Sequence, residues 1–271
     1  MSKVINKLRT RKEKIYSTLA LTFGVVLWIC IILVTLATLG GTNEEAKKAL
    51  LSFIQYPFYF IVFRLISGAV YRATAFGNMI LLGPEQFPEL YAMVVSGSRE
   101  LGMNEPPTTF LYNSHGLFNA FARRLLGGKY VFLTSALVEA NNEDQVRFVI
   151  GHELGHHAAG HLNPWLNFLK LPSYAIPFLM RAYSRSCEYS CDNMGVYVSK
   201  DVVASRSSLQ MLGCGCRRLN QTMNCEAFMA QEDKVPPIFG FLSEIYRRHP
   251  RLTRRVAAIN ERSVKLEDSG A

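Results

Sequence analysis

The feature that most constrains this chain is an apolar run from Ile15 to Leu39 that contains no charged residue. A helix needs about 20 apolar residues to cross a bilayer, so this run is long enough to span one. The apolar core of a cleaved signal peptide is usually shorter, about 7–15 residues. We therefore expect residues 1–14 to form a basic tail and residues 15–39 an uncleaved transmembrane helix.

A second apolar stretch runs from Ala49 to Val70 and is interrupted by Pro57 and Arg64. A central arginine costs roughly 2.5–3.5 kcal/mol on insertion scales, which the surrounding apolar residues can offset. We expect residues 49–70 to be a second transmembrane helix; an interfacial helix, or a core helix of the soluble part, is the alternative.

The charge distribution predicts how such a chain sits in a membrane. Basic residues ahead of the first span place the N-terminus in the cytoplasm, and two spans return the rest of the chain to that side. One span would leave it outside. Six cysteines, of which an odd number lie beyond the first span, favour a reducing compartment.

The net charge is +9, from 30 Lys and Arg against 21 Asp and Glu. Many of these basic residues flank apolar segments, as in membrane proteins, and no aromatic residues alternate with them as in RNA-binding motifs. We therefore expect a lipid bilayer and no nucleic acid as a partner. The sequence leaves the oligomeric state undetermined.

Beyond residue 72 the pattern predicts a mainly α domain with a small β-sheet, over residues 72–263, followed by a disordered tail over 264–271. Expected helices cover 79–102, 143–159, 182–200 and 202–212, and the last one ends near Ser263. Thr108–Tyr112 and Tyr130–Thr134 are expected strands, connected by a loop that contains Gly127 and Gly128. Residues 163–180, with three prolines, are expected to be interfacial or to line a groove, with plain domain core as the alternative.

Four of the six histidines lie in GHELGHHAAGH, residues 151–161. His152 and His156 are four residues apart, so on a helix both imidazoles can face one ion. Asn142 and Gln145 predict a capping box that opens this helix. Glu153 can hold a water molecule beside the ion and take its proton, which is the arrangement of hydrolytic zinc sites.

The third ligand is the test of this hypothesis. On a continuing helix His161 lies about 140° around from His156, and His157 about 100°, so both are poor candidates. Glu188 and Asp192 share a helix face, and Glu188 could complete a set of two histidines and one glutamate. Asp192 could then accept the other ring N–H of a ligand histidine. Cys187 and Cys191 could be soft ligands but are better explained as small packing residues.

These segments resemble the membrane-bound gluzincin peptidases that include bacterial HtpX and the CAAX prenyl endopeptidases. The resemblance rests on GHELGHHAAGH followed by CEYSCD, on NAFA at 119–122, and on Arg248-His249-Pro250 with Arg255. It implies a zincin-like metallopeptidase domain that binds one Zn²⁺ per chain, with His152, His156 and Glu188 as ligands and Glu153 as general base.

The resemblance also implies roles for residues outside the zinc ligands. Asn119 and His249 would hydrogen-bond the substrate backbone or the developing oxyanion, and Arg255 would orient the carboxylates. Strand Tyr130–Thr134 would be a sheet edge that pairs with an extended substrate through Tyr130, Val131, Phe132 and Leu133.

The expected function is therefore a membrane-anchored zinc endopeptidase that acts on membrane or misfolded proteins and faces the cytoplasm. A non-catalytic zinc-fold membrane scaffold or chaperone-like binding module is the alternative, although such a module would not need Glu153.

Overall fold

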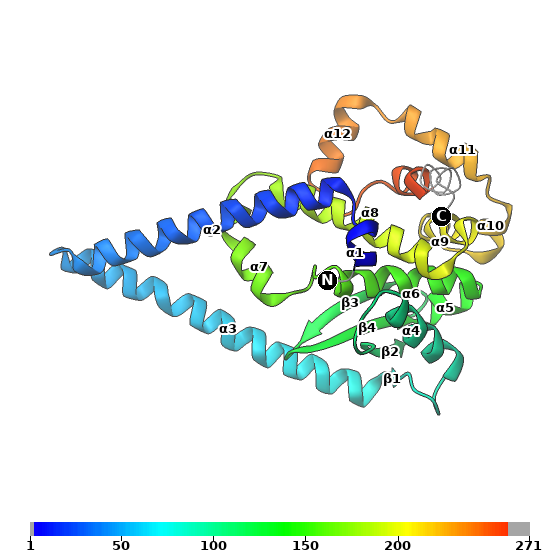
Figure 1. Ribbon diagram of the computed structural model, residues 1–271, viewed down its shortest axis with the longest axis horizontal. Helices are drawn as coiled ribbons and strands as arrows, with labels where there is room; N and C mark the ends of the chain where they lie inside the picture. Colours follow the sequence, from blue (N-terminus) through cyan, green and yellow to red (C-terminus); the bar gives the residue numbers. More distant parts are fainter. Residues whose placement is uncertain (1–2, 260–271) are drawn as a thin grey trace.

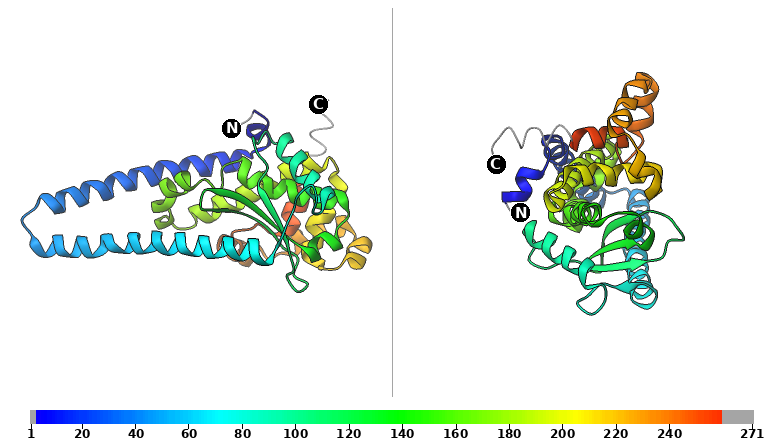
Figure 2. Two further views of the ribbon diagram at one scale, coloured as in Figure 1. Left: turned by 90° about the horizontal axis from the view of Figure 1, so that it is seen from below. Right: turned by 90° about the vertical axis from the view of Figure 1, so that its right-hand side faces the viewer.

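The computed structural model describes residues 3–259. Two long helices, α2 (Arg11–Gly40) and α3 (Glu44–Asn78), are joined by a short turn and form a hairpin that projects from the rest of the chain (Figures 1 and 2). Both are long and apolar enough to cross a membrane. Helices therefore occupy both predicted spans, and each extends beyond its predicted bounds.

The first half of α2 lies against the body of the molecule. Gly24 allows this close approach, because a Cβ atom there would lie 2.2 Å from the Leu169 carbonyl oxygen. The partners of α2 include the long helix α8 (Leu179–Ser199), α7 (Pro164–Lys170) and the 3-10 helix η1 (Leu171–Ala175). Ser173 Oγ donates to the Ala20 carbonyl at 2.6 Å, and the Trp28 ring stacks on Phe168. The proline-rich segment thus packs beside the apolar helix, while Trp165 and Tyr174 are exposed.

A four-stranded sheet lies between the helices, with strand order β1-β2-β4-β3. The strands are β1 (Ile80–Leu81), β2 (Thr108–Tyr112), β3 (Ala120–Leu125) and β4 (Gly128–Thr134). Side chains alternate between the two faces, as strands require. Val131 and Leu133 face the core around α4 (Pro88–Glu100) and α6 (Glu143–Ala158), while Phe110 and Phe132 pack toward the end of α3.

The prediction that Tyr130–Thr134 is an edge strand is wrong. This strand, β4, is interior, paired in parallel with β2 and antiparallel with β3. Tyr130, Val131, Phe132 and Leu133 are buried in the two cores, so they cannot contact a substrate as predicted. The strand β3 was not predicted, because Arg123 and Arg124 interrupt its apolar pattern. It forms the edge of the sheet instead.

Two other predicted elements differ from the structure. Residues 79–102 are not one helix, because the first part forms β1 and a turn, and α4 begins only at Pro88, where proline suits the first helical turn. The last described helix covers residues 252–259. Residues 260–263 and the predicted disordered tail, 264–271, lie outside the described residues.

The helices α6 and α8 (Leu179–Ser199) cross closely, and this crossing brings the candidate site together. The predicted capping box opens α6, because Asn142 and Gln145 exchange hydrogen bonds of 2.7 and 2.9 Å. At the crossing, a Cβ atom on Gly195 would lie 2.8 Å from the Phe148 carbonyl oxygen, and one on Gly155 would lie 2.9 Å from the Met194 sulfur. Glycines therefore permit the helix spacing that the site requires.

The remaining labelled helices lie around this pair and the sheet, with α9 to α12 gathered toward the right and upper right of Figure 1. They are α1 (Lys3–Leu8), α5 (Ser135–Ala140), α9 (Val202–Cys214), α10 (Arg217–Thr222), α11 (Cys225–Ala230), the 3-10 helix η2 (Gln231–Lys234) and α12 (Pro237–Ile245). Glu232 pairs with Arg251 and Arg254 and so connects η2 to the chain that leads into the last helix.

Candidate metal centre

Three side chains from the crossing helices converge on one point. The Nε2 atom of His152 lies 3.6 Å from Glu188 Oε2, and the Nε2 atom of His156 lies 3.7 Å from Glu188 Oε1. The three donor atoms lie within 4.8 Å of one another. His152 and Glu188 are buried and His156 is half-buried, so the group is largely withdrawn from solvent.

The donor set fits a zinc ion. Ligand atoms about 2.0–2.2 Å from a tetrahedral zinc lie about 3.3–3.6 Å from one another, close to the separations observed here. Two imidazoles and one carboxylate form the ligand set of several hydrolytic zinc enzymes. Burial lowers the pKa of His156 well below its usual value, so this imidazole is neutral, as a metal ligand must be.

Asp192 and Arg255 support this group from behind. Asp192 Oδ1 lies 3.0 Å from His152 Nδ1, the ring nitrogen that faces away from Glu188. Arg255 donates to both oxygens of Asp192, at 2.6 and 2.9 Å, and lies 3.5 Å from Glu188 Oε2. Burial opposes ionisation, but the Arg255 guanidinium outweighs it and lowers the pKa of Asp192. The structure therefore places both residues where a ligand-orienting role requires them.

Glu188 also stays ionised. Burial would raise its pKa, but a hydrogen bond from His249 and the charge of Arg255 lower it below the usual range of a glutamate. His249 Nδ1 lies 2.9 Å from Glu188 Oε2, and the His249 side chain is 70% exposed. His249, the predicted substrate contact, thus lies at the opening of the site and hydrogen-bonds to the candidate ligand Glu188.

Glu153 lies next to the convergent group, on the side of the sheet edge. Burial raises the pKa of its carboxyl group, while a hydrogen bond from the backbone N–H of Ala122, in β3, opposes the rise. The outer edge of β3 is thus directed at the carboxylate. The sequence analysis did not predict this contact. Strand β3 carries two arginines, and nothing in its sequence indicates which edge of the sheet faces α6.

A cleft of about 530 Å³ opens onto these residues. Its lining includes His152, Glu153 and Glu188, together with Asn119 just before β3, His249 and Arg255. The structure therefore brings the predicted ligands His152 and Glu188, the predicted base Glu153, and Asn119 and His249 together around one cavity. The predicted substrate contacts Tyr130, Val131, Phe132 and Leu133 do not line this cavity.

The other histidines of the motif do not belong to the convergent group. His157 Nε2 lies 2.9 Å from the Tyr130 carbonyl oxygen, so its ring N–H holds β4 against α6, and burial lowers its pKa to about 4. It is therefore buried and not solvated. His161 is also buried, as expected of a satisfied polar group. Its Nε2 lies 3.1 Å from Glu13. Cys187 and Cys191 are buried free thiols in α8.

Comparisons with known proteins identify the family of this chain. A model of peptidase family M48 matches residues 84–174 and 164–263, which together cover more than half of the chain. The chain therefore belongs to peptidase family M48.

Two curated relatives bear similar names. The plastoglobule-localized metallopeptidase 48 of Arabidopsis thaliana is 26% identical over 214 residues, which cover 70% of this chain and 61% of that protein. A protease HtpX homolog of Pyrobaculum islandicum is 24% identical over 152 residues, covering 53% of this chain and 40% of the relative. The chain thus spans about three fifths of the first relative and two fifths of the second.

Among solved structures, the crystal structure of S. mikatae Ste24p is similar to this chain. The TM-score is 0.48 and the identity 18%, with 92% of this chain and 66% of that chain covered.

Proposed function

We propose that this chain is a membrane-anchored zinc endopeptidase that hydrolyses peptide bonds in membrane or misfolded proteins. The observation that carries the proposal is the convergence of His152, His156 and Glu188. Two of these residues, His152 and Glu188, line one cleft together with Glu153. The family and the names of both relatives support a metallopeptidase.

His152 and His156 would hold one zinc ion through Nε2, and Glu188 through its carboxylate. When bound, zinc supplies a water of lowered pKa, about 7, and polarises the substrate carbonyl. Asp192 fixes the tautomer of His152 by accepting its Nδ1–H, so Nε2 presents a lone pair to the ion. Arg255 keeps Asp192 ionised for this purpose.

Glu153 would act as the general base. Its carboxylate takes a proton from the attacking water and delivers it to the amine that leaves when the peptide bond breaks. A buried carboxyl with a raised pKa is better suited to hold that proton between the two steps than a solvated one. Because Glu153 is not itself a proposed ligand, its replacement should leave metal binding intact.

The substrate would lie along the outer edge of β3 as an added strand. The direction of the Ala122 N–H toward Glu153 supports this position, because a peptide paired there lies beside the base. Asn119 and His249, on the cleft walls, would contact the substrate backbone or the oxyanion as it develops.

The membrane topology is part of the proposal. The basic residues near the start of α2, and Arg64 and Arg72 of α3, lie toward the end of the hairpin near the peptidase domain, whereas the far turn has balanced charge in Glu44, Glu45, Lys47 and Lys48. By the positive-inside rule this charge distribution supports a domain that faces the cytoplasm. A reporter fused after Ala271 would test it: activity only of a reporter that works outside the cytoplasm would overturn this topology.

The test of the catalytic proposal compares the purified full-length wild type with Glu153→Gln on an unfolded protein substrate. The variant should keep one zinc per chain and lose at least about 100-fold in cleavage rate. Full activity with zinc in place would exclude Glu153 as the base. Zinc binding without any chelator-sensitive cleavage by the wild type would favour a non-catalytic scaffold.

A further inference from the structure

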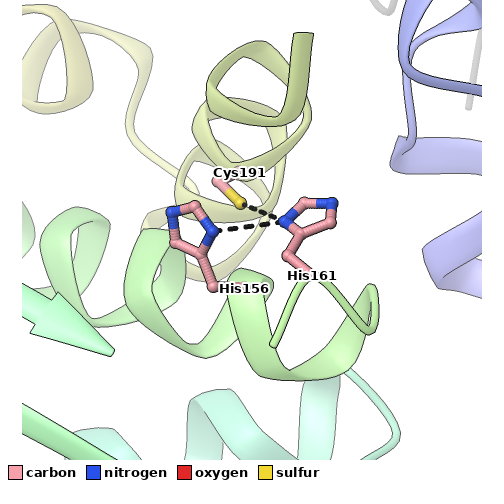
Figure 3. A group of neighbouring side chains, drawn as sticks. All are labelled: His156, His161 and Cys191. Carbon is pink, nitrogen blue, oxygen red and sulfur yellow. Dashed lines mark hydrogen bonds between the residues drawn. The ribbon is translucent and has the colours of Figure 1, made fainter. Parts of the chain in front are cut away.

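The two candidate histidine ligands have different partners behind them. His152 uses Nδ1 to contact Asp192, a residue of the peptidase domain. His156 uses Nδ1 to contact the Nδ1 atom of His161, at 3.2 Å. Figure 3 shows the two imidazoles meeting edge to edge, with Cys191 beside them. His156 therefore reaches a second imidazole where His152 reaches a carboxylate.

The second imidazole leads to a carboxylate from a distant part of the chain. His161 Nε2 lies 3.1 Å from Glu13 Oε1, and Glu13 is in the first turn of α2. The Glu13 side chain is 0% exposed. Arg9 holds it with contacts of 2.6 and 2.7 Å. The apolar hairpin thus places a buried ion pair against the back of the candidate site.

The proton positions along this chain of contacts follow from the chemistry of each group. An ionised carboxylate only accepts hydrogen bonds, so His161 carries its proton on Nε2 and donates it to Glu13. In the neutral form of His161, Nδ1 is then the acceptor, and His156 donates from its own Nδ1. The lone pair of His156 therefore resides on Nε2, the atom that faces Glu188. Cys191 Sγ, 3.6 Å from His161 Nδ1, is a weak donor and is compatible with this arrangement.

Direct contacts hold α2 in the position that this chain requires. Ser190 Oγ, in α8, accepts from the Thr10 backbone N–H at 2.9 Å, and Asn193 donates to the Leu8 carbonyl at 2.8 Å. Further along α2, Lys170 donates to Ser17 Oγ at 2.9 Å. The docking of α2 on α8 therefore determines where Glu13 lies.

A second metal ion in place of these hydrogen bonds is the competing explanation. His161 with His156 and Cys191, or with Glu13 and Cys187, also brings three donor atoms within 4.8 Å. However, a cation between Glu13 and His161 would meet the positive charge of Arg9, which already pairs with Glu13. Both nitrogens of His161 also have hydrogen-bonding partners. The contacts therefore favour hydrogen bonds over a metal.

We propose that Glu13, at the start of the apolar hairpin, is a positioning residue for the zinc ligand His156 and acts through His161. The inference rests on the proposed zinc site. With Glu13 in this role, the zinc site is complete only when α2 is docked on the peptidase domain. Docking of the hairpin and zinc affinity are then coupled. Partners of this kind typically change metal affinity about 10–100-fold.

The experiment measures the zinc affinity of the full-length protein in detergent by competition with a chromogenic chelator. We expect the zinc Kd to rise about 10-fold in Glu13→Gln and about 10- to 100-fold in His161→Leu. The double variant should resemble the larger single effect, because both changes interrupt one chain. The control is Glu44→Gln at the far turn of the hairpin, which should bind zinc as the wild type does.

Thermal unfolding of the zinc-free proteins separates positioning from packing. If Glu13 only stabilises the docking of α2, the melting temperature falls in both variants while the zinc Kd stays within twofold of the wild type, and the inference is wrong. His161→Leu leaves the Arg9–Glu13 pair in place and serves if Glu13→Gln does not fold. The inference would also be wrong if the wild type bound two zinc ions per chain and His161→Leu bound only one.

These outcomes are distinct from failure of the proposed function. If the wild type bound no zinc, or if Glu153→Gln cleaved normally with zinc bound, the zinc endopeptidase itself would be excluded. If the wild type binds one zinc and cleaves, while Glu13→Gln and His161→Leu bind zinc normally, only the role of Glu13 is excluded.

Discussion

The two candidate histidine ligands are supported by two arms of different origin. The Asp192 arm, with Arg255, lies wholly within the peptidase domain and reaches His152 directly. The Glu13 arm, with Arg9, comes from the start of the apolar hairpin and reaches His156 through His161. Each arm ends in a buried carboxylate paired with an arginine. One half of the candidate site is therefore complete in the folded domain, while the other half depends on how the hairpin docks.

The largest effect is expected from Arg255, which holds two buried carboxylates of the domain arm. Arg255→Leu would leave Asp192 and Glu188 buried without their guanidinium partner, so the zinc-free protein should lose about 3–5 kcal/mol in its free energy of unfolding. Urea unfolding checks this. The neighbouring Arg254→Leu, which breaks half-exposed pairs, should cost less than about 1 kcal/mol. Equal losses in the two variants would contradict the account.

A smaller effect is expected at the helix crossing that both arms share. Gly195→Ala places a methyl group 2.8 Å from the Phe148 carbonyl oxygen, which is backbone and cannot rotate away. We expect a loss of about 1–3 kcal/mol in the free energy of unfolding, together with weaker zinc binding, because α6 and α8 carry different ligands. At Gly213, in α9, the added methyl group meets its nearest atom at 3.6 Å, so Gly213→Ala is the matched control. Similar effects at the two positions would show that the crossing is not tight.

The third prediction compares the arms directly. Asp192→Asn removes the charge of the carboxylate that contacts His152 and should raise the zinc Kd about 10- to 100-fold. Glu143→Gln, on the exposed first turn of α6, is the control and should have no effect. Because Asp192 contacts its ligand without an intermediate residue, its effect should equal or exceed that of Glu13→Gln. A larger effect from Glu13 would show that the hairpin arm dominates.

Much of this site was predictable because its signals are local. The i, i+4 spacings of His152 with His156 and of Glu188 with Asp192 follow from helix geometry alone, and the cap at Asn142 locates the first helix. The structure confirms both helices and brings the four side chains together.

The parts that the sequence did not predict depend on contacts between distant segments. Strand order decides that β3, and not β4, forms the edge, and no periodicity encodes that order. Glu13 lies about 150 residues from His161 in the chain. Its one signal is that it is the single acidic residue in a basic N-terminal segment. Arg9 is a local partner, and only the docking of α2 brings His161 to that residue.

The most direct test of the account is the zinc content of Glu188→Ala beside His161→Leu, measured at saturating zinc in the full-length protein. The account predicts one zinc per chain in the wild type and in His161→Leu, and none in Glu188→Ala. Zinc retained in Glu188→Ala but lost in His161→Leu would contradict it, because the metal would then lie between His156, His161 and their buried neighbours.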